Sequence, residues 1–260
     1  MARTAVLGRL SWLVATVTAV RDETATARTI VLDVPGWRGH AAGQHVDVRL
    51  TAEDGYSAQR SYSIASAPDG SRLELTVQRL ADGEVSPYLA SDLMIGYPLE
   101  LRGPIGGWFV WDPADTDPVL LVAGGSGIVP LMSMIRARAA AGSTAGFRLI
   151  YSVRDPGTVI YADELAKRAS AGDGLTVDYV YTRQAPAGSA RPAGRITAAD
   201  LAEPGDAQPR RTVFHRHPPV SGKSVFVCGP TGYVEGVAGL LTAAGYDAAT
   251  IKTERFGPTG

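Results

Sequence analysis

The spacing of hydrophobic residues changes near the middle of this chain. Over residues 12–110, short runs of strand-forming residues alternate with turn signals such as Asp82-Gly83. Many short strands with regular turns predict a closed antiparallel β-barrel or a sandwich. The expected strands are 13–20, 29–34, 45–50, 60–65, 73–78 and 99–101. A short helix is expected over 88–93, because Ser86 suits the N-cap and Pro87 the first helical position.

After residue 118, apolar strands alternate with helical segments. Val119 to Ala123 form an unbroken apolar run, typical of a strand buried on both faces, and a helix is expected over 128–141. Further strands are expected near Phe147, Leu175, Val225 and Ala249, and further helices near Ala162, Thr197 and Tyr233. This alternation implies a parallel, Rossmann-like sheet with covered faces. Because the polar stretch 112–118 suits a linker, we expect a six-stranded barrel domain over 1–112 and an α/β domain over 113–260.

Composition narrows the class of protein. The 260 residues are enough for two domains, and 45% hydrophobic with 20% charged residues predicts a soluble globule. The net charge of −1 gives no support for binding nucleic acid, and no apolar run approaches the roughly 18 residues of a membrane span. Cys228 is the single cysteine, which excludes an internal disulfide and favours a cytoplasmic setting. His215 and His217 could bind a metal only with further ligands, so no metal is expected.

A glycine-rich turn follows the first strand of the α/β half. Gly124, Gly125 and Gly127 stand between that strand and the helix. A strand, turn and helix in this order present backbone N–H groups and a positive helix end to a phosphate. The spacing is not the six-residue GxGxxG fingerprint, however, so a tight turn without any ligand remains an alternative from these residues alone.

A second candidate lies in the barrel half, in residues 60–66, RSYSIAS. Alternate side chains of a strand share a face, so Arg60 and Tyr62 point one way and Ser63 the other. An arginine can hold a phosphate through two parallel hydrogen bonds. Taken alone, the residues favour a surface arginine and a core tyrosine.

Together the motifs resemble those of the ferredoxin–NADP(H) reductase family of flavoproteins. Residues 60–66 are similar to that family's flavin motif, Arg-x-Tyr-Ser/Thr-x-x-Ser. The resemblance implies that Arg60 holds the FAD pyrophosphate, Tyr62 stacks on the isoalloxazine ring, and Ser63 bonds near the flavin N5. Gly83-Glu84-Val85-Ser86 resembles the second phosphate element, Gly-x-x-Ser, which leads into the short helix. An ordinary turn is the alternative for that element.

The α/β half carries three further motifs of the same family. Gly124-Gly125-Ser126-Gly127-Ile128-Val129-Pro130 resembles the nucleotide loop GGxGIxP, and Cys228-Gly229-Pro230 resembles a motif whose cysteine lies beside the nicotinamide. Glu254 and Phe256 resemble a near-terminal Glu-x-aromatic, in which the glutamate approaches the active site and the ring covers the flavin. Four residues follow Phe256, unlike members whose aromatic residue is the last. A core cysteine, an exposed carboxylate and a core phenylalanine are the alternatives.

The resemblance implies an FAD-dependent NAD(P)H oxidoreductase with Ser63, Cys228 and Glu254 at the catalytic centre. Many members carry a [2Fe–2S] domain held by four cysteines, and this sequence has one. Electrons are therefore expected to pass to a separate acceptor such as a ferredoxin, a flavodoxin or an oxygenase component. The alternatives are an NAD(P)H:flavin reductase that uses flavin as a substrate, and a non-catalytic flavin-binding electron-transfer subunit or redox sensor.

The choice of nucleotide depends on the residues that follow the second and third strands of the α/β half. An acidic residue at that edge binds the ribose diol of NADH, whereas an arginine accepts the 2′-phosphate of NADPH. Ser152 and Arg154 end the second strand and Arg183 follows the third, although Asp155 makes the signal mixed. The sequence therefore predicts NADPH as co-substrate, with NADH possible.

Overall fold

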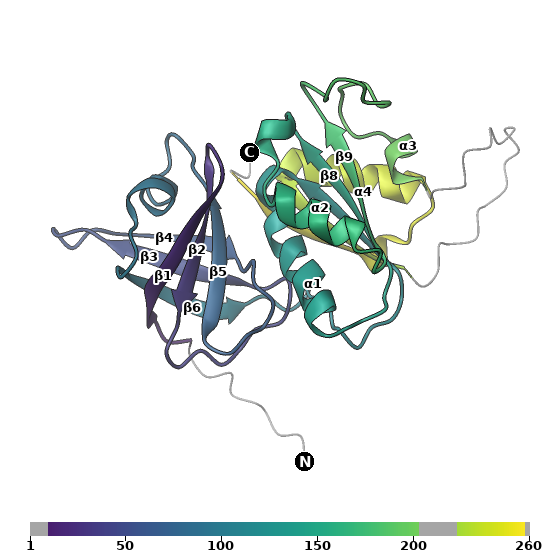
Figure 1. Cartoon of the computed structure of the whole chain (residues 1–260). Helices are drawn as coiled ribbons and strands as arrows, with labels where there is room; N and C mark the ends of the chain where they lie inside the picture. Colours follow the sequence, from purple (N-terminus) through teal and green to yellow (C-terminus); the bar gives the residue numbers. More distant parts are fainter. Residues whose placement is uncertain (1–9, 203–222, 258–260) are drawn as a thin grey trace, which may run out of the picture.

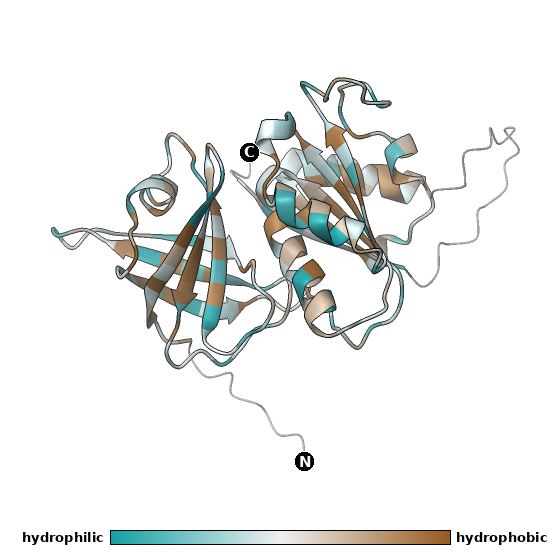
Figure 2. Cartoon of the chain, in the orientation of Figure 1, coloured by the Kyte–Doolittle hydropathy of each residue, from teal (hydrophilic) through white to brown (hydrophobic). Residues whose placement is uncertain are grey.

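The computed structural model describes residues 10–202 and 223–257. It contains two sheets, one in each half of the chain, which lie side by side with helix α1 between them (Figure 1). The apolar residues of each half gather on its own strands and on the helix faces toward them (Figure 2). Each half has a core on its own sheet, and the core around α1 also includes Ala27, Ala42 and Ala65 of the barrel half.

The first half is a six-stranded antiparallel sheet, which confirms the predicted fold. Its strand order is β4-β3-β6-β1-β2-β5. A bridge between Ile64 and Leu75 joins the two edge strands and closes the sheet into a barrel. The strands are β1 (Leu13–Thr24), β2 (Ala27–Asp33), β3 (His45–Thr51), β4 (Ser57–Ser63), β5 (Arg72–Gln78) and β6 (Pro98–Ile105).

Several elements of the barrel differ in their bounds from the sequence-based expectation. Strand β1 continues to Thr24 instead of ending at residue 20, and β6 covers Pro98–Ile105 instead of 99–101. Strand β4 ends at Ser63 rather than Ala65, because Ile64 leaves β3 and pairs with Leu75 instead. The expected helix over 88–93 is a short π-helix, η1 (Tyr88–Asp92). The Ser86 hydroxyl does not cap it, since that oxygen accepts a hydrogen bond from the Leu80 N–H at 3.1 Å.

The second half is a five-stranded parallel sheet covered on both faces, which confirms the α/β prediction. Its order is β11-β10-β7-β8-β9. The strands are β7 (Val119–Gly124), β8 (Phe147–Val153), β9 (Leu175–Tyr181), β10 (Ser224–Pro230) and β11 (Ile251–Phe256). The helices are α1 (Ile128–Ala140), α2 (Ala162–Ser170), α3 (Ala198–Leu201) and α4 (Thr231–Ala243), with 3₁₀ turns η2 (Gly125–Gly127), η3 (Pro156–Thr158) and η4 (Ala248–Thr250). The last strand starts at Ile251, later than expected, because η4 occupies the residues before it.

The strand order sets the place of a binding site. The chain runs outward from β7 through β8 to β9, and then returns to the other side of β7 to form β10 and β11. The boundary between β7 and β10 is thus a topological switch point, and α/β sheets bind ligands at the carboxyl ends of the strands there. The glycine turn and the Cys228-Gly229-Pro230 motif end these two strands.

The connection between the halves is exposed. Residues 112–118 contain no helix or strand, and every one of them is exposed to solvent. Among the residues that the structure describes, no helix combines the length and the apolar character that crossing a bilayer requires.

Candidate active site

The candidate site lies where the ends of four strands from the two halves meet. In the barrel, His45 of β3 is the direct partner of Ser63 of β4. In the α/β half, Cys228 of β10 is the direct partner of Glu254 of β11. The two pairs face each other, because Glu254 Oε1 lies 4.0 Å from His45 Nδ1 and the Ser63 side chain hydrogen-bonds the Glu254 carboxyl group. The structure therefore brings together Ser63, Cys228 and Glu254, as expected, and adds His45, which sequence reasoning missed.

Glu254 is the most perturbed carboxyl group of this site. Burial raises its pKa to about 7, against the opposing effect of the Ser63 hydrogen bond. Its Oε2 atom is buried and has no hydrogen-bond partner among the described residues. A buried carboxyl oxygen of this kind is a candidate for contact with a ligand or a proton, because leaving it unpaired costs free energy. Burial lowers the pKa of neighbouring His45, and the charge of Asp47 opposes that shift.

Cys228 is a neutral thiol. Its residue is 1% exposed, and burial together with the nearby Glu254 charge raises the pKa of the thiol. Since the thiolate is the reactive form of cysteine, these surroundings do not favour a covalent role. What Cys228 offers is a small, uncharged side chain at the carboxyl end of β10.

The flavin motif and the second phosphate element are in contact. The exposed Arg60 guanidinium lies 2.5 Å from the Glu84 carboxylate, which belongs to the Gly83–Ser86 element. Glu84 also accepts a hydrogen bond from the Tyr56 hydroxyl at 3.0 Å. Tyr62 is partly buried against the barrel core, and burial raises its pKa to about 12. Sequence reasoning missed Glu84, although it stands inside a motif that was singled out.

The Gly83–Ser86 element is tightly packed. A Cβ atom at Gly83 would lie 2.7 Å from the Ser86 Oγ atom and 3.3 Å from the Leu80 carbonyl oxygen, so a larger residue there would force the Ser86 side chain to move. Val85 is 1% exposed and belongs to the barrel core.

Phe256 lies at the very end of β11, beside Pro230 of β10, and 37% of the residue is exposed to solvent. Its ring is available to a ligand at the carboxyl edge.

The nucleotide-loop motif and the Cys228-Gly229-Pro230 motif pack backbone against backbone. A Cβ atom at Gly127 would lie 2.2 Å from the carbonyl oxygen of Cys228. At Gly124 and Gly229 it would lie 2.7 Å from the ring of Tyr233. The 3₁₀ turn formed by Gly125, Ser126 and Gly127 leads directly into α1. This arrangement places the partly accessible Gly125 and Ser126 at the N-terminus of a helix, where peptide N–H groups can bind phosphate.

The first turn of α4 adds two residues that sequence reasoning missed. The Thr231 hydroxyl is buried and has no hydrogen-bond partner among the described residues. The Tyr233 hydroxyl donates to the Ala123 carbonyl at 3.0 Å and is in hydrogen-bond contact with Ser152. Their only sequence signal is their position, directly after the Cys228-Gly229-Pro230 motif.

The three residues proposed to select the nucleotide occupy one edge of the sheet. The Arg183 N–H donates to the Arg154 carbonyl at 2.9 Å, which places the two arginines side by side. Both arginines are exposed. Ser152 is 6% exposed and is turned toward Tyr233. Of the three, the arginines are the ones that reach solvent.

No metal site is found in the part of the chain that the structure describes, where no group of three or more His, Cys, Asp or Glu side chains could hold a metal ion. His215 and His217 lie outside the described residues.

Comparisons with known proteins agree with this arrangement. Residues 15–110 match the family model of the oxidoreductase FAD-binding domain, and residues 121–239 match that of the oxidoreductase NAD-binding domain. The crystal structure of a ferredoxin NADP⁺ reductase from Neisseria gonorrhoeae, with bound FAD and NADP, is similar with a TM-score of 0.74. That match has 20% sequence identity and covers 94% of this chain and 98% of the other. It shows that the two share a fold.

Two curated relatives are similar in sequence. The glycine betaine monooxygenase reductase subunit of Pseudomonas aeruginosa is 34% identical over 219 residues, which are 84% of this chain and 56% of the relative. The ferredoxin reductase component of 3-ketosteroid-9-alpha-monooxygenase from Mycolicibacterium smegmatis is 34% identical over 250 residues, 92% of this chain and 64% of the relative. The chain thus spans less than two thirds of the length of either relative.

Proposed function

The chain belongs to the ferredoxin–NADP(H) reductase family, and from this premise we propose that it moves a hydride from NAD(P)H to bound FAD and then delivers electrons to a separate acceptor. One observation carries the proposal. Ser63 from the barrel and Glu254 with Cys228 from the α/β half converge on one place, next to the nucleotide-loop motif. We place the domain boundary in the exposed segment, with FAD bound by residues 1–112 and NAD(P)H by residues 113–260.

The barrel residues fit FAD. Arg60 and the Gly83–Ser86 element suit its pyrophosphate, and the half-buried Tyr62 ring suits one face of its isoalloxazine. Ser63 and Glu254 would lie near the flavin N5. The buried Glu254 Oε2 has no hydrogen-bond partner among the described residues, which supports a contact between this atom and the flavin. Phe256 would cover the other face of the ring. When bound, FAD supplies the chemistry that accepts a hydride and releases electrons one at a time.

The α/β residues fit a pyridine nucleotide. Gly124, Gly125, Ser126 and Gly127 would hold its pyrophosphate through peptide N–H groups, and the buried Thr231 hydroxyl offers one more donor. Cys228, Gly229 and Pro230 would line the nicotinamide site. The uncharged Cys228 suits this place, because its small side chain lets the ring approach closely. The exposed pair of Arg154 and Arg183 favours NADPH over NADH, because arginines at this edge accept the 2′-phosphate. Ser152 lies at the same edge of the sheet, at the end of β8.

The acceptor we propose is an oxygenase component, a ferredoxin or a flavodoxin. The two relatives named above are reductase parts of monooxygenases, one of them a ferredoxin reductase component. A [2Fe–2S] cluster held by four cysteines needs more than the one cysteine of this sequence. A cytoplasmic setting is also proposed, because that cysteine is buried as a free thiol and no disulfide is possible.

The test is an absorbance spectrum of the purified protein before and after anaerobic NADPH, followed by turnover with ferricyanide. We expect a flavin spectrum that is retained through gel filtration, is bleached by NADPH, and recovers with ferricyanide. Flavin that is lost on the column while turnover needs added flavin would favour an NAD(P)H:flavin reductase. Retained flavin with no turnover would favour a non-catalytic subunit or redox sensor.

A further inference from the structure

Helix α1 connects the two candidate binding sites directly. Its first residue, Ile128, follows the glycine turn, and its middle reaches the end of the flavin motif. The Ser133 hydroxyl donates to the Ser66 carbonyl at 2.7 Å, and the Arg136 guanidinium donates to the Ala65 carbonyl at 3.0 Å. At 1.5 Å per residue, these contacts lie roughly 8 and 12 Å along the helix from Ile128. A stiff stretch of about one and a half to two helical turns therefore joins the nucleotide loop to the flavin motif.

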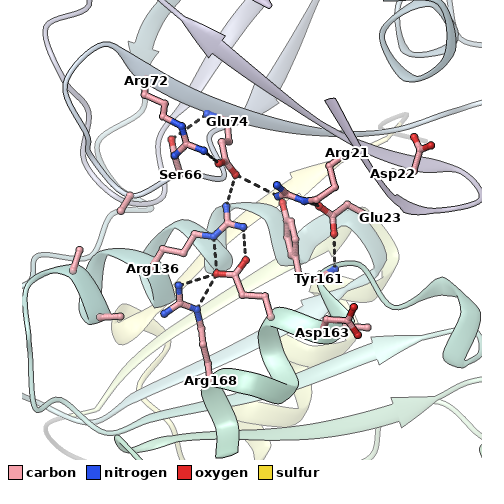
Figure 3. A pocket seen from close by; sticks show the side chains of 15 residues that line it. Arg21, Asp22, Glu23, Ser66, Arg72, Glu74, Arg136, Tyr161, Asp163 and Arg168 are labelled. Atoms are coloured by element: carbon pink, nitrogen blue, oxygen red, sulfur yellow. Dashed lines mark hydrogen bonds and ion pairs between the residues drawn. The ribbon is translucent and has the colours of Figure 1, made fainter. Parts of the chain in front are cut away.

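Arg136 is the centre of a largely buried ion-pair network between the two halves, formed with Glu74 and Glu164 and called the seam below (Figure 3). Its side chain is 11% exposed and donates to Glu74 of β5 at 2.9 Å, across the domain boundary. On its own side, its Nε and Nη2 atoms donate to the Glu164 carboxylate of α2, at 3.1 and 2.5 Å. One planar cation thus joins α1, α2 and β5, with defined geometry at every contact.

Glu74 is held from several directions on the barrel side. Its side chain is 7% exposed and pairs with Arg72 and Arg136, while Arg21 lies 3.7 Å away (Figure 3). Its own N–H donates to the Ser66 hydroxyl at 3.1 Å. The backbone of Glu74, whose carboxylate receives Arg136, is therefore bonded to the same Ser66 whose carbonyl receives Ser133.

A second set of hydrogen bonds between the two halves lies beside the seam. Tyr161, directly before α2, donates its hydroxyl to Thr76 Oγ1 of β5 at 2.5 Å, and its N–H donates to Glu23 of β1 at 3.3 Å. The Arg136 guanidinium lies 5.0 Å from the centre of the Tyr161 ring. Tyr161, Glu23 and Arg136 line a charged cleft of about 780 Å³ between the halves.

The geometry points to Ser133 and Arg136 as positioning residues for hydride transfer: they hold the nucleotide-loop helix on the last residues of the flavin motif. This inference rests on the proposed function. The reason is that a buried ion pair is weak evidence for stability, whereas Arg136 bonds two other elements, α2 and β5, at once and so constrains how they lie relative to α1. Hydride transfer needs the reacting atoms about 3–3.5 Å apart, so a misplacement near 1 Å can cost about a hundredfold in rate.

The test compares matched variants of the full-length, FAD-loaded protein. Arg136→Gln removes the seam, Arg136→Lys keeps the charge without the planar fork, and Ser133→Ala removes one hydroxyl. Arg168→Gln is the control, because Arg168 lines the same cleft and its ion pair is with Glu164 of its own helix. It makes the same change in net charge as Arg136→Gln.

Two measurements separate positioning from a general structural role. We expect Arg136→Gln to slow the limiting rate of flavin reduction at saturating NADPH by about 10- to 100-fold, while the Kd values for FAD and NADP⁺ change by less than about twofold. Small-angle X-ray scattering should show a wider spread of domain orientations in this variant than in the wild type. Arg136→Lys and Ser133→Ala should slow reduction by smaller factors, and Arg168→Gln should match the wild type in both measurements.

A wild-type reduction rate in Arg136→Gln, or equal slowing in Arg168→Gln, would overturn the inference. If Arg136→Gln does not fold, Ser133→Ala and Arg136→Lys decide the matter, and wild-type rates in both would overturn it. Failure of the proposed function looks different, because NADPH and NADH would then leave the wild-type flavin oxidised. If the proposed function fails in this way, small-angle X-ray scattering still tests whether Arg136 sets the orientation of the two domains. Scattering profiles that match the wild type in all variants would then overturn the inference.

Discussion

The two halves of this protein offer their proposed ligands different kinds of atoms. The barrel offers side chains, namely the exposed Arg60, the half-buried Tyr62 and Ser63, all from strand β4 and its end. The α/β half offers mainly backbone, because glycines at 124 and 127 leave no room for a side chain. Changes in the barrel site should therefore remove binding and spare the fold, whereas changes in the glycine turn should damage both.

The reason lies in how each sheet is covered. An antiparallel sheet need not be covered on both faces, and β4 keeps side chains from both of its faces accessible to a ligand, Arg60 and Tyr62 on one and Ser63 on the other. A parallel sheet is covered on both faces and is open only at the carboxyl ends of its strands. What lies there is a turn, and in this chain the turn after β7 packs against the turn after β10.

The largest expected effect is a loss of stability when the glycine turn after β7 is changed. In Gly127→Ala, the new Cβ atom would lie 2.2 Å from the Cys228 carbonyl oxygen, which the surrounding sheet holds in place. We expect a loss of about 3 kcal/mol or more in the free energy of unfolding, measured by urea denaturation. Gly236→Ala is the control, because an added Cβ there meets nothing within 4 Å. That control should be neutral or stabilising by about 0.5–1 kcal/mol, and equal losses in the two variants would contradict the close-packing argument.

The next effect concerns Glu254, at the junction of the two halves. Its pKa rises from 4.5 in the unfolded chain to about 7 in the fold, so the native state binds the proton more tightly. The associated stability is fully present below pH 4.5 and is lost as the pH rises through about 7. We expect the wild type to lose roughly 2–3 kcal/mol more than Glu254→Gln between pH 4.5 and pH 8 in urea denaturation. Parallel pH profiles for the two proteins would refute the assigned shift.

The variant Arg60→Ala tests whether a barrel side chain binds FAD. Loss of a charge-assisted contact to the pyrophosphate should weaken FAD binding by about 1.5–3 kcal/mol, or about 10- to 100-fold in Kd. The thermal stability of the FAD-free protein should stay close to that of the wild type, because Arg60 is exposed. Arg49→Ala, which breaks the ion pair with Glu100, is the control and should leave the Kd for FAD unchanged. An Arg60→Ala protein that binds FAD normally would remove the arginine from the site.

The smallest expected effect is on nucleotide choice, where the α/β half uses side chains as the barrel does. Arg154→Ala should raise the KM for NADPH by about tenfold and leave that for NADH nearly unchanged, since an exposed contact to the 2′-phosphate is worth about 1.5 kcal/mol. Steady-state kinetics with both nucleotides measures this. Equal wild-type kcat/KM values for NADPH and NADH, or equal damage to both in the variant, would show that the assignment is wrong.

The sequence by itself determined the two sheets, their order along the chain and the motif segments. The reason is that alternation on half-buried strands, apolar runs on buried strands and glycine turns are local patterns, each set by residues within a few positions of one another. Even there, β4 ended early, because Ile64 pairs with Leu75 of a distant strand. The family resemblance then supplied roles for residues such as Arg60 and Cys228.

Only the tertiary structure decided which other side chains join the site. His45 comes to Glu254 across the domain boundary, Glu84 reaches Arg60, and Thr231 is left buried without a described partner. Arg136 stands in a mostly apolar helix, α1, and its partner Glu74 is 62 residues away along the chain. Such contacts depend on how the two sheets are placed against each other, and no periodicity within either half encodes that placement.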